Sequence, residues 1–269
     1  VIIVGRNQNL ASDRVRAVLG KQGEPGRPSN PASAQVWSSI LNTVDLPDSE
    51  TDWVSTTDLA RTSLARHPWS LAGGGVSALL PLLQASASYL SDRATSIGIT
   101  SFTLEDDAYL APRASLRTRA MNSHLIRWMI LGDEIRDWIE SPDTAAIFPY
   151  TEDLHPIDPA SEAGVLKRLW PVRTNLRNNI MFGGRTKVET GLLWTEYGRL
   201  TTSKLRIPLS ITFAFVATHN HFVLDRGGKV FNRSAPVIKL PAEATEDDHL
   251  QLLGVLNSST ACFWLKQNS

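Results

Sequence analysis

The sequence predicts a mixed α/β fold in which short sheets are braced by helices. Ser210–Thr218 (SITFAFVAT) is a run of apolar and β-branched residues, which indicates a buried strand. After His219–Asp225, the turn residues Gly227 and Gly228 lead into Lys229–Phe231. This pattern predicts a hairpin.

The segment that follows supplies another strand and a helix. Val237–Leu240 (VIKL) lies between two prolines and is a strand candidate. Thr245 and Asp248 have the spacing of a capping pair at a helix start. We therefore expect a mixed sheet with a helix packed on it. The apolar residues of that helix are Leu250, Leu253, Leu256, Phe263 and Trp264.

Length and composition are those of an ordinary globular protein. A chain of 269 residues, 42% hydrophobic and 20% charged, fits one large domain or two smaller ones. The single cysteine, Cys262, excludes an internal disulfide framework and a thiolate-rich zinc site, which suits the cytoplasm. No apolar run reaches the roughly 18 to 20 residues that span a bilayer, so no membrane partner is expected.

The first part of the chain has its own strand and helix signals. Val1–Val4 (VIIV) is continuously apolar, as is typical of a buried strand in a helix-covered sheet. Gly20–Pro31 is rich in glycine and proline and predicts a loop, after which Asn30 as cap and Pro31 at the first helical position start a helix. Because the chain begins with valine and stops just beyond a helix, we expect an internal fragment of a longer protein.

A glycine run precedes the next helix. Gly73–Gly75 stands before a helical pattern that begins at Val76. A phosphate-binding loop is not indicated, because the Walker lysine and the G-x-G-x-x-G spacing are both missing. We expect this helix to be a connector, with a domain boundary near Ser91–Ser96.

The charges balance, with 27 basic and 27 acidic residues, but they are unevenly distributed. The stretch from Lys167 to Arg206 is basic and combines arginine with asparagine and the pair Gly183-Gly184. Arginine can contact guanine and asparagine adenine, while glycine lets the backbone approach phosphates. The stretch predicts a DNA-binding loop, with a solvated surface loop as the alternative. The candidate residues are Arg173, Asn175, Arg177, Asn178, Asn179, Arg185, Lys187, Arg199, Lys204 and Arg206.

Two clusters resemble metal ligands but are better explained otherwise. Glu105–Asp107 are adjacent acids, and acids gather at helix starts because the helix dipole favours them there. His219 and His221 would share a face of a strand, yet the other histidines are not at short spacing from them. No metal site is predicted.

Several segments together resemble a known family. Thr218–Pro241 (THNHFVLDRGGKVFNRSAPVIKLP) followed by Leu252–Gln267 (LLGVLNSSTACFWLKQ) resembles the target-recognition region of adenine-specific DNA methyltransferases of the BREX, or phage-growth-limitation, type. Ile97–Tyr109, Ile130–Trp138 and Ala145–Tyr150 resemble further segments of that region, in the family's order.

This resemblance implies a division of the chain. Residues 1–95 would be the last strand of the methyltransferase catalytic domain plus a helical connector. Residues 96–269 would be the DNA target-recognition domain, incomplete at its C-terminus. The parent protein would use S-adenosylmethionine to methylate the exocyclic amino group of adenine, with double-stranded DNA and other phage-defence proteins as partners.

Chemistry-bearing motifs are absent from the sequence itself. There is no Asn/Asp/Ser-Pro-Pro-Tyr/Phe loop to hold a flipped adenine, no glycine-rich loop after a first strand, and no G-x-S-x-G elbow. We therefore expect no methyl transfer by this chain alone and assign it no catalytic or cofactor-binding residue. Two alternatives remain open: a protein–protein scaffold surface in a phage-defence complex, and a restriction-modification enzyme that both methylates and cleaves DNA.

Overall fold

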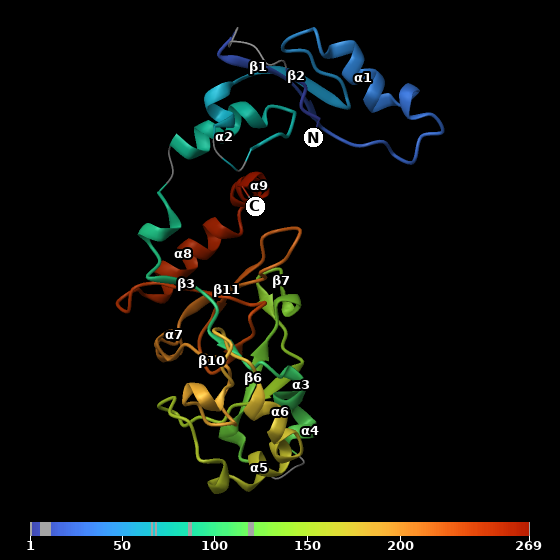
Figure 1. Ribbon diagram of the computed structural model, residues 1–269. Helices are drawn as coiled ribbons and strands as arrows, with labels where there is room; N and C mark the ends of the chain where they lie inside the picture. The colour runs from blue at the N-terminus through green and yellow to red at the C-terminus, as the bar shows by residue number, and fades with distance from the viewer. Residues whose placement is uncertain are drawn as a thin grey trace. The chain divides into compact units, whose positions relative to one another are not determined.

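The computed structural model describes residues 2–5, 12–65, 67, 69–85, 88–117 and 121–268 (Figure 1). The chain divides into two compact units. The smaller unit consists of Val1–Ser88 together with Phe263–Ser269, and the larger of Tyr89–Cys262. Several short sheets alternate with helices, which confirms the predicted mixed α/β class.

An antiparallel pair of strands forms the centre of the smaller unit. β1 (Arg14–Gly20) pairs along its whole length with β2 (Val54–Ala60), and α1 (Gln35–Thr43) packs against β2. The expected cap at Asn30 is present, but it opens a short 3-10 turn (Pro31–Ser33), and α1 itself begins only at Gln35, with Ala34 as its N-cap. The turn opens with Pro31, and the Asn30 side chain accepts a hydrogen bond from a backbone N–H inside the turn.

The glycine segment before α2 (Val76–Ala85) has a packing role. Gly73 N–H donates to Gly20 O at 3.0 Å. A Cβ atom on Gly73 would lie 2.6 Å from Ser55 Oγ, so only glycine allows this close approach to β2. The end of α9 (Ser259–Asn268) also belongs to this unit, where Ser70 Oγ donates to Gln267 Oε1 at 3.0 Å.

The predicted opening strand is wrong for its described part. Ile2, Ile3 and Val4 form no strand, and their side chains are exposed; Val1 lies outside the described residues. An apolar run becomes a buried strand only where a neighbouring strand supplies hydrogen bonds and another layer covers it. Among the described residues, nothing supplies either to this segment.

A four-stranded antiparallel sheet, in the order β12-β11-β14-β3, lies in the larger unit. The strands predicted at the start of 210–218 and at 237–240 are confirmed, but the first ends at Phe213 rather than reaching Thr218. The strands are β3 (Ser96–Gly98), β11 (Ser210–Phe213), β12 (Phe222–Asp225) and β14 (Val237–Lys239).

A second four-stranded sheet has the order β13-β6-β9-β5, with β13 parallel to β6. The predicted hairpin at Gly227 and Gly228 is therefore wrong in its pairing. The turn exists, with φ of 96° and 79° at the two glycines, but it carries the chain from β12 in one sheet to β13 in the other. The strands are β5 (Leu110–Pro112), β6 (Ile126–Ile130), β9 (Thr144–Ile147) and β13 (Val230–Phe231).

Short elements complete the larger unit. Asp106 and Asp107 lie in the first turn of a helix, as predicted for the acidic run 105–107. The strand pairs are β4 (Ser101–Phe102) with β10 (Arg199–Leu200) and β7 (Ile135–Arg136) with β8 (Ile139–Glu140). The helices are α3 (Asp106–Tyr109), α4 (Arg113–Arg117), α5 (Ala163–Leu169), α6 (Arg173–Asn178) and α7 (Thr202–Arg206).

The capping pair before α8 (Glu246–Leu256) is confirmed. Thr245 Oγ1 accepts from Asp248 N–H at 3.2 Å, and Asp248 Oδ2 accepts from Thr245 N–H at 2.8 Å. α8 packs on β12 and β11, so a helix does brace the sheet. The predicted helix is interrupted, however, because Asn257 and Ser258 separate α8 from α9.

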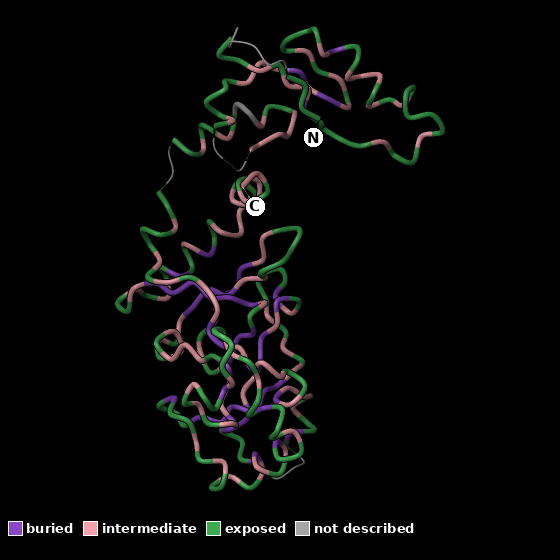
Figure 2. Tube along the Cα trace, in the orientation of Figure 1, coloured by how far each residue is buried: buried purple, intermediate pink, exposed green. Residues whose placement is uncertain are grey.

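An aromatic cluster lies in the core of the larger unit, where Figure 2 shows buried backbone running through the sheets. The rings of Tyr109 and Tyr197 meet edge to face, with centroids 5.1 Å apart. The Tyr109 hydroxyl donates to Thr195 O at 3.0 Å, and the Tyr197 hydroxyl donates to Ile147 O at 2.7 Å. Tyrosine thus fills the core and satisfies two buried backbone carbonyls, one in the irregular segment 191–198 and one at the end of β9.

Candidate nucleic-acid interface

An open cleft lies beside α6 in the larger unit. Its volume is about 290 Å³, and it contains three of the residues predicted from sequence to bind DNA: Arg173, Arg177 and Asn178. These residues were expected in a loop, and that expectation is wrong, since residues 173–178 form a helix. A helix places residues three and four apart on the same face, which is why Arg173 and Arg177 share the cleft. The other lining residues are Trp170, Thr174 and Trp194.

Two tryptophans give this cleft aromatic walls. The Trp170 and Trp194 rings meet edge to face, with centroids 6.2 Å apart, and Trp170 is 51% exposed. The Arg173 guanidinium stacks 4.3 Å above the Trp170 ring while its Nη1 donates to Trp170 O at 3.0 Å. These two contacts hold the Arg173 side chain in place. Its planar guanidinium stacks on the flat face of the indole ring, which the ammonium of a lysine does less well.

A tight turn follows α6. Met181 N–H donates to Arg185 O at 2.8 Å, and Gly184 N–H donates to Met181 O at 3.0 Å. Gly183 and Gly184 have φ of 99° and 80°, which suits glycine. At the tip Phe182 is fully exposed, and Arg185 is exposed as well. The turn therefore presents an aromatic ring and a guanidinium to solvent.

Lys187 follows this turn directly and is buried beneath it. Its side chain is fully buried, and its Nζ donates to Glu196 O at 2.8 Å. Burial lowers the pKa of the Lys187 ammonium to about 8. The prediction that Lys187 contacts DNA phosphates is wrong for this structure, because nothing outside the protein can reach its ammonium.

Asn179 is also used inside the protein. When its amide oxygen and nitrogen are placed to satisfy their neighbours, the nitrogen donates to Glu105 Oε1 at 3.0 Å and to Asn175 O at 3.1 Å. Asn179 is half-buried, whereas Asn175 is exposed on α6. Asn179 therefore links α6 to the segment before α3. Both hydrogen atoms of its side-chain nitrogen are used in these bonds, so that nitrogen has no donor left for a ligand.

The remaining predicted residues come from two other elements. Arg199 is exposed on β10, and Arg206 is exposed at the end of α7. Lys204 on α7 is half-buried. Burial lowers the pKa of its ammonium, and repulsion by the nearby positive charge of Arg199 lowers it further. The cleft beside α6 contains none of these three.

Sequence reasoning missed the aromatic residues. Trp170, Trp194 and Phe182 were not among the predicted site residues, although each lies within or beside the basic stretch. For Phe182 a signal existed, since an aromatic residue next to Gly183-Gly184 in a polar turn has no core to join. For the two tryptophans the sequence offers no such signal, because tryptophan is usually buried.

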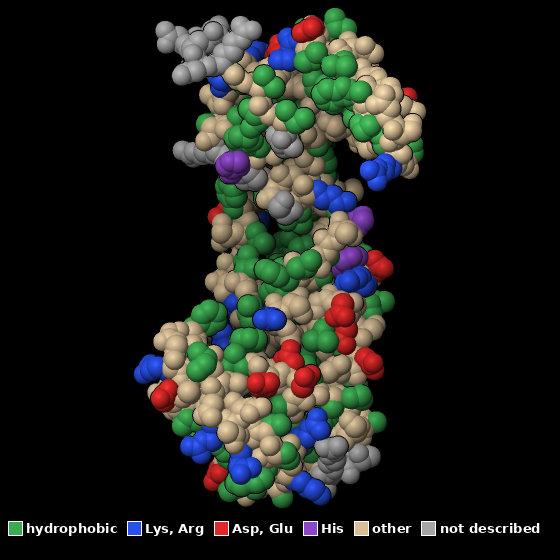
Figure 3. Space-filling view, turned by 45° about the vertical axis from the view of Figure 1, so that its right-hand side comes forward, with side chains coloured by type: hydrophobic (Ala, Val, Ile, Leu, Met, Phe, Trp, Pro, Cys, Tyr) green, Lys and Arg blue, Asp and Glu red, His purple; other side chains and the backbone are tan. Residues whose placement is uncertain are grey.

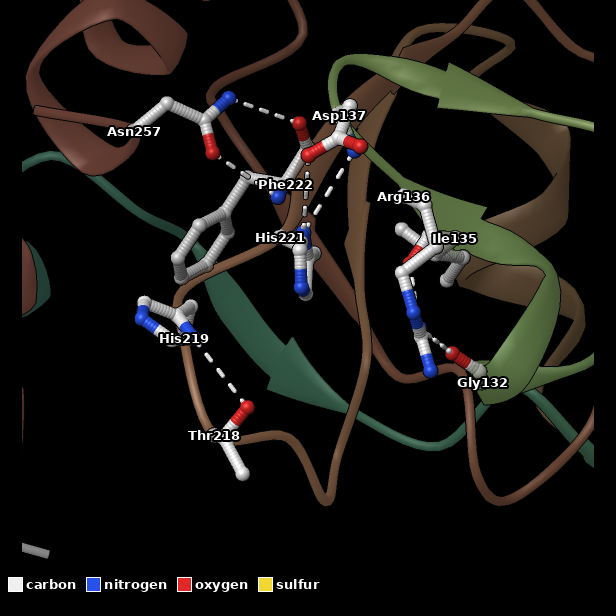
Figure 4. Close-up of polar contacts among 9 residues, drawn as sticks. All are labelled: Gly132, Ile135, Arg136, Asp137, Thr218, His219, His221, Phe222 and Asn257. Carbon is white, nitrogen blue, oxygen red and sulfur yellow. Dashed lines mark hydrogen bonds and ion pairs between the residues drawn. The ribbon is translucent and has the colours of Figure 1, made fainter.

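The two histidines do not act together (Figure 4). His221 Nδ1 accepts from Asp137 N–H at 3.4 Å, while His219 Nδ1 and Thr218 Oγ1 lie 3.1 Å apart. Neither histidine lies in a strand, since β12 begins only at Phe222. Within the described residues, no three His, Cys, Asp or Glu side chains are grouped so that they could hold a metal ion.

Charge is unevenly spread over the visible face of the larger unit. In Figure 3 acidic side chains gather across its middle, and several basic ones lie at the lower end, where Figure 1 places α5 and α6. None of the helices in the described ranges is long and apolar enough to cross a bilayer.

The cleft and the turn combine exposed guanidinium and amide groups with aromatic surfaces. Such a set of groups can bind phosphates and stack on bases.

Comparison with known proteins shows what the chain is similar to. It matches a segment of a larger adenine-specific methyltransferase, which confirms the resemblance predicted from its motifs. That relative is the adenine-specific methyltransferase PglX of Streptomyces coelicolor, 40% identical over 272 residues. The match covers 100% of the chain and 22% of the relative. No protein-family model matches the chain.

Proposed function

We propose that this chain is the target-recognition part of a phage-defence DNA methyltransferase that uses S-adenosylmethionine to methylate the amino group of adenine. Duplex DNA is the partner, and the cleft beside α6 together with the turn 180–186 is its contact surface. The observation that carries this proposal is the grouping of Arg173, Arg177 and Asn178 in one cleft with the exposed ring of Trp170 and the half-buried ring of Trp194. The match to PglX supports the class of the parent protein.

The residues divide the work of binding between them. Arg177 is exposed and makes no ion pair or hydrogen bond with any described residue, so its guanidinium is free for a phosphate or a guanine edge. Arg185, on the neighbouring turn, offers a second free guanidinium. Arg173 is fixed on Trp170 and presents its remaining N–H groups from a set position. The fixed arginine can orient the DNA on the surface, and the free arginines can add to the binding affinity.

Anisotropy titrations of labelled duplexes test the proposal. Arg177→Ala should weaken DNA binding by about 1 to 3 kcal/mol if the side chain reads a base. Arg27→Ala is the matched control, because Arg27 is an exposed arginine of the smaller unit. A wild-type chain that binds no duplex above the level of an unrelated acidic protein, or an Arg177→Ala chain that binds like wild type at low and high salt, would contradict the proposed surface.

One observation favours the second candidate, a protein–protein scaffold. Trp138, in the turn between β7 and β8, and Ile139, at the start of β8, are 54% and 64% exposed, and interface centres are apolar and enriched in aromatic residues. Trp138→Ser should then abolish binding to a partner protein without changing DNA affinity. The DNA titration above separates the two functions, since the scaffold hypothesis expects no effect of Arg177→Ala.

A further inference from the structure

A second, small pocket lies where the two four-stranded sheets of the larger unit meet. Its volume is about 30 Å³, room for two or three water molecules at about 10 to 15 Å³ each. It is lined by residues of α7, of β6 and β14, and of the Gly227-Gly228 turn. A pocket of this size can hold one small ion but not a nucleoside. The charged residues that line it are Arg127, Lys204, Asp225, Lys229 and Lys239.

Two of these charges neutralise each other. Lys229 Nζ lies 2.6 Å from Asp225 Oδ1 and also pairs with Glu140, which is mostly buried. Four basic side chains line the pocket, and the carboxylates that pair with them are Asp225 in the lining and Glu140 outside it, which leaves an excess of two positive charges (4 − 2). An excess of like charge at a partly buried site is costly unless an anion compensates it.

Three of the basic side chains, those of Arg127, Lys204 and Lys239, have no hydrogen bond or ion pair to a carboxylate among the described residues. Lys239 is only 4% exposed, and its ammonium donates to Ile207 O and, at 2.9 Å, to Leu209 O, both neutral carbonyls. Arg127 stacks 4.0 Å above the Phe148 ring. Neither the Arg127 guanidinium nor the Lys204 ammonium has a hydrogen bond or ion pair with any residue that the structure describes. Their donors are therefore available to a ligand.

The effect of burial on these groups agrees with an anion site. Burial lowers the pKa of the Lys239 ammonium to about 8; the charge of Asp225 raises this pKa and that of Lys204 lowers it. Burial also lowers the pKa of Arg127, against the opposing effect of Tyr197 and Glu152, and burial together with the charge of Arg199 lowers the pKa of Lys204. All three pKa values would return upward if an anion shared the pocket, since an opposite charge favours the protonated form.

We infer that this pocket binds a phosphoryl oxyanion, with Lys204 and Arg127 as its direct donors and Lys239 as a fixed positive charge behind them. The phosphoryl group is either a backbone phosphate of DNA or a free phosphate ion. Only the first source rests on the proposed function. The cleft beside α6 shares no lining residue with this pocket, so the two sites can be tested separately.

Thermal melting of the 269-residue chain in sodium phosphate, against sodium chloride of equal ionic strength, tests the site. Phosphate should raise Tm in a saturable way that chloride does not reproduce. Lys204→Met should weaken the apparent phosphate affinity by about tenfold or more, and Arg127→Met should act in the same direction. Arg206→Ala is the matched control, because Arg206 is exposed on the same helix and does not line the pocket. Equal Tm gains in both salts, or a phosphate effect that survives both methionine variants, would overturn the inference.

A competition experiment identifies the source of the phosphoryl group. If DNA supplies it, saturating phosphate should weaken duplex binding by the wild-type chain at fixed ionic strength, and Lys204→Met should remove that sensitivity. If the ligand is free phosphate, the melting response persists while DNA affinity stays constant. Arg177→Ala separates the two proposals, since it should impair DNA binding and leave the phosphate-dependent rise in Tm intact.

Discussion

The buried ammonium of Lys187 donates a hydrogen bond of 2.8 Å to the backbone carbonyl of Glu196. Lys187 stands at the end of the turn that exposes Phe182 and Arg185, and Glu196 leads directly into the buried Tyr197. The bond therefore ties the exposed turn to the aromatic core. A basic residue that composition assigns to DNA contact instead fixes the position of the residues that are exposed.

The stability of the chain should rise with pH above neutrality because of its buried lysines. Burial lowers the pKa of Lys187 from 10.5 to about 8, and the same holds for Lys239. Between these two pH values the unfolded chain keeps a proton that the folded chain has lost, so the free energy of unfolding increases as pH rises through 8 toward 10.5. Each lysine should contribute about 2 kcal/mol by pH ~9.5. Urea unfolding at several pH values measures this.

The matched variant for that experiment is Lys187→Met, which keeps the length of the side chain and removes its titration. It should lose about half of the pH-dependent gain. Above pH 10 the raised pKa values of Tyr109, Tyr150 and Tyr197 act in the opposite direction, so the comparison ends below that point. Identical pH dependence in the variant and the wild type would show that Lys187 is charged and solvated in solution.

Asn257 and Phe222 exchange two hydrogen bonds, and removing them should loosen α8 from the sheet. Phe222 N–H donates to Asn257 Oδ1 at 3.0 Å, and Asn257 Nδ2 donates to Phe222 O at 2.8 Å, so the amide acts as a neighbouring strand along the edge of β12 (Figure 4). Asn257→Ala should cost about 1 to 3 kcal/mol, measured by urea unfolding. Asn257→Asp should cost a similar amount, because a carboxylate accepts from Phe222 N–H but cannot donate to Phe222 O. No loss in either variant would show that water replaces the amide.

The two glycines of the β12–β13 turn should differ in their tolerance of a side chain. Both have positive φ, so Gly227→Val and Gly228→Val should each destabilise the fold by about 1 kcal/mol or more. A Cβ atom on Gly227 would in addition lie 3.0 Å from Pro208 Cβ, whereas one on Gly228 meets nothing within 4 Å. Thermal melts should therefore rank Gly227→Val below Gly228→Val. Two variants that melt like wild type would place the turn elsewhere.

Local signals were read correctly from the sequence, whereas tertiary partners were not. The caps at Asn30 and Thr245 depend on a few adjacent residues; Thr245 caps α8 as predicted, and Asn30 caps the 3-10 turn that precedes α1. Gly227 and Gly228 do form a turn, but the choice of β6 as the partner of β13 depends on residues about a hundred positions away. Ile2–Val4 had the composition of a buried strand, and the composition does not say whether another strand lies beside it.

The candidate site follows the same division. Composition marked Lys167–Arg206 as basic, and Arg173, Arg177 and Arg185 in it are exposed, since charged side chains without partners stay in water. It gave no means of separating Lys187 from Arg185, which lie two residues apart and differ completely in burial. The burial of Lys187 depends on two distant residues, the backbone carbonyl of Glu196 and the ring of Tyr109. They lie next to the Lys187 ammonium only in the folded chain.

Phe182 provides the sharpest test of the proposed DNA surface, because it is fully exposed and contributes nothing to the core. Phe182→Ala should leave the thermal melt unchanged and weaken duplex binding by about 1 to 3 kcal/mol, if the ring stacks on a base or wedges between base steps. Phe215→Ala is the matched control, since Phe215 is another exposed phenylalanine of the larger unit. An apolar contact releases no counterions, so Phe182→Ala should keep the salt dependence of binding, while Arg185→Ala should reduce its slope by about 1. Anisotropy titrations at several salt concentrations measure both quantities. If Phe182→Ala and Phe215→Ala bind DNA equally well, the turn does not enter a groove, and DNA contact must be confined to the cleft beside α6.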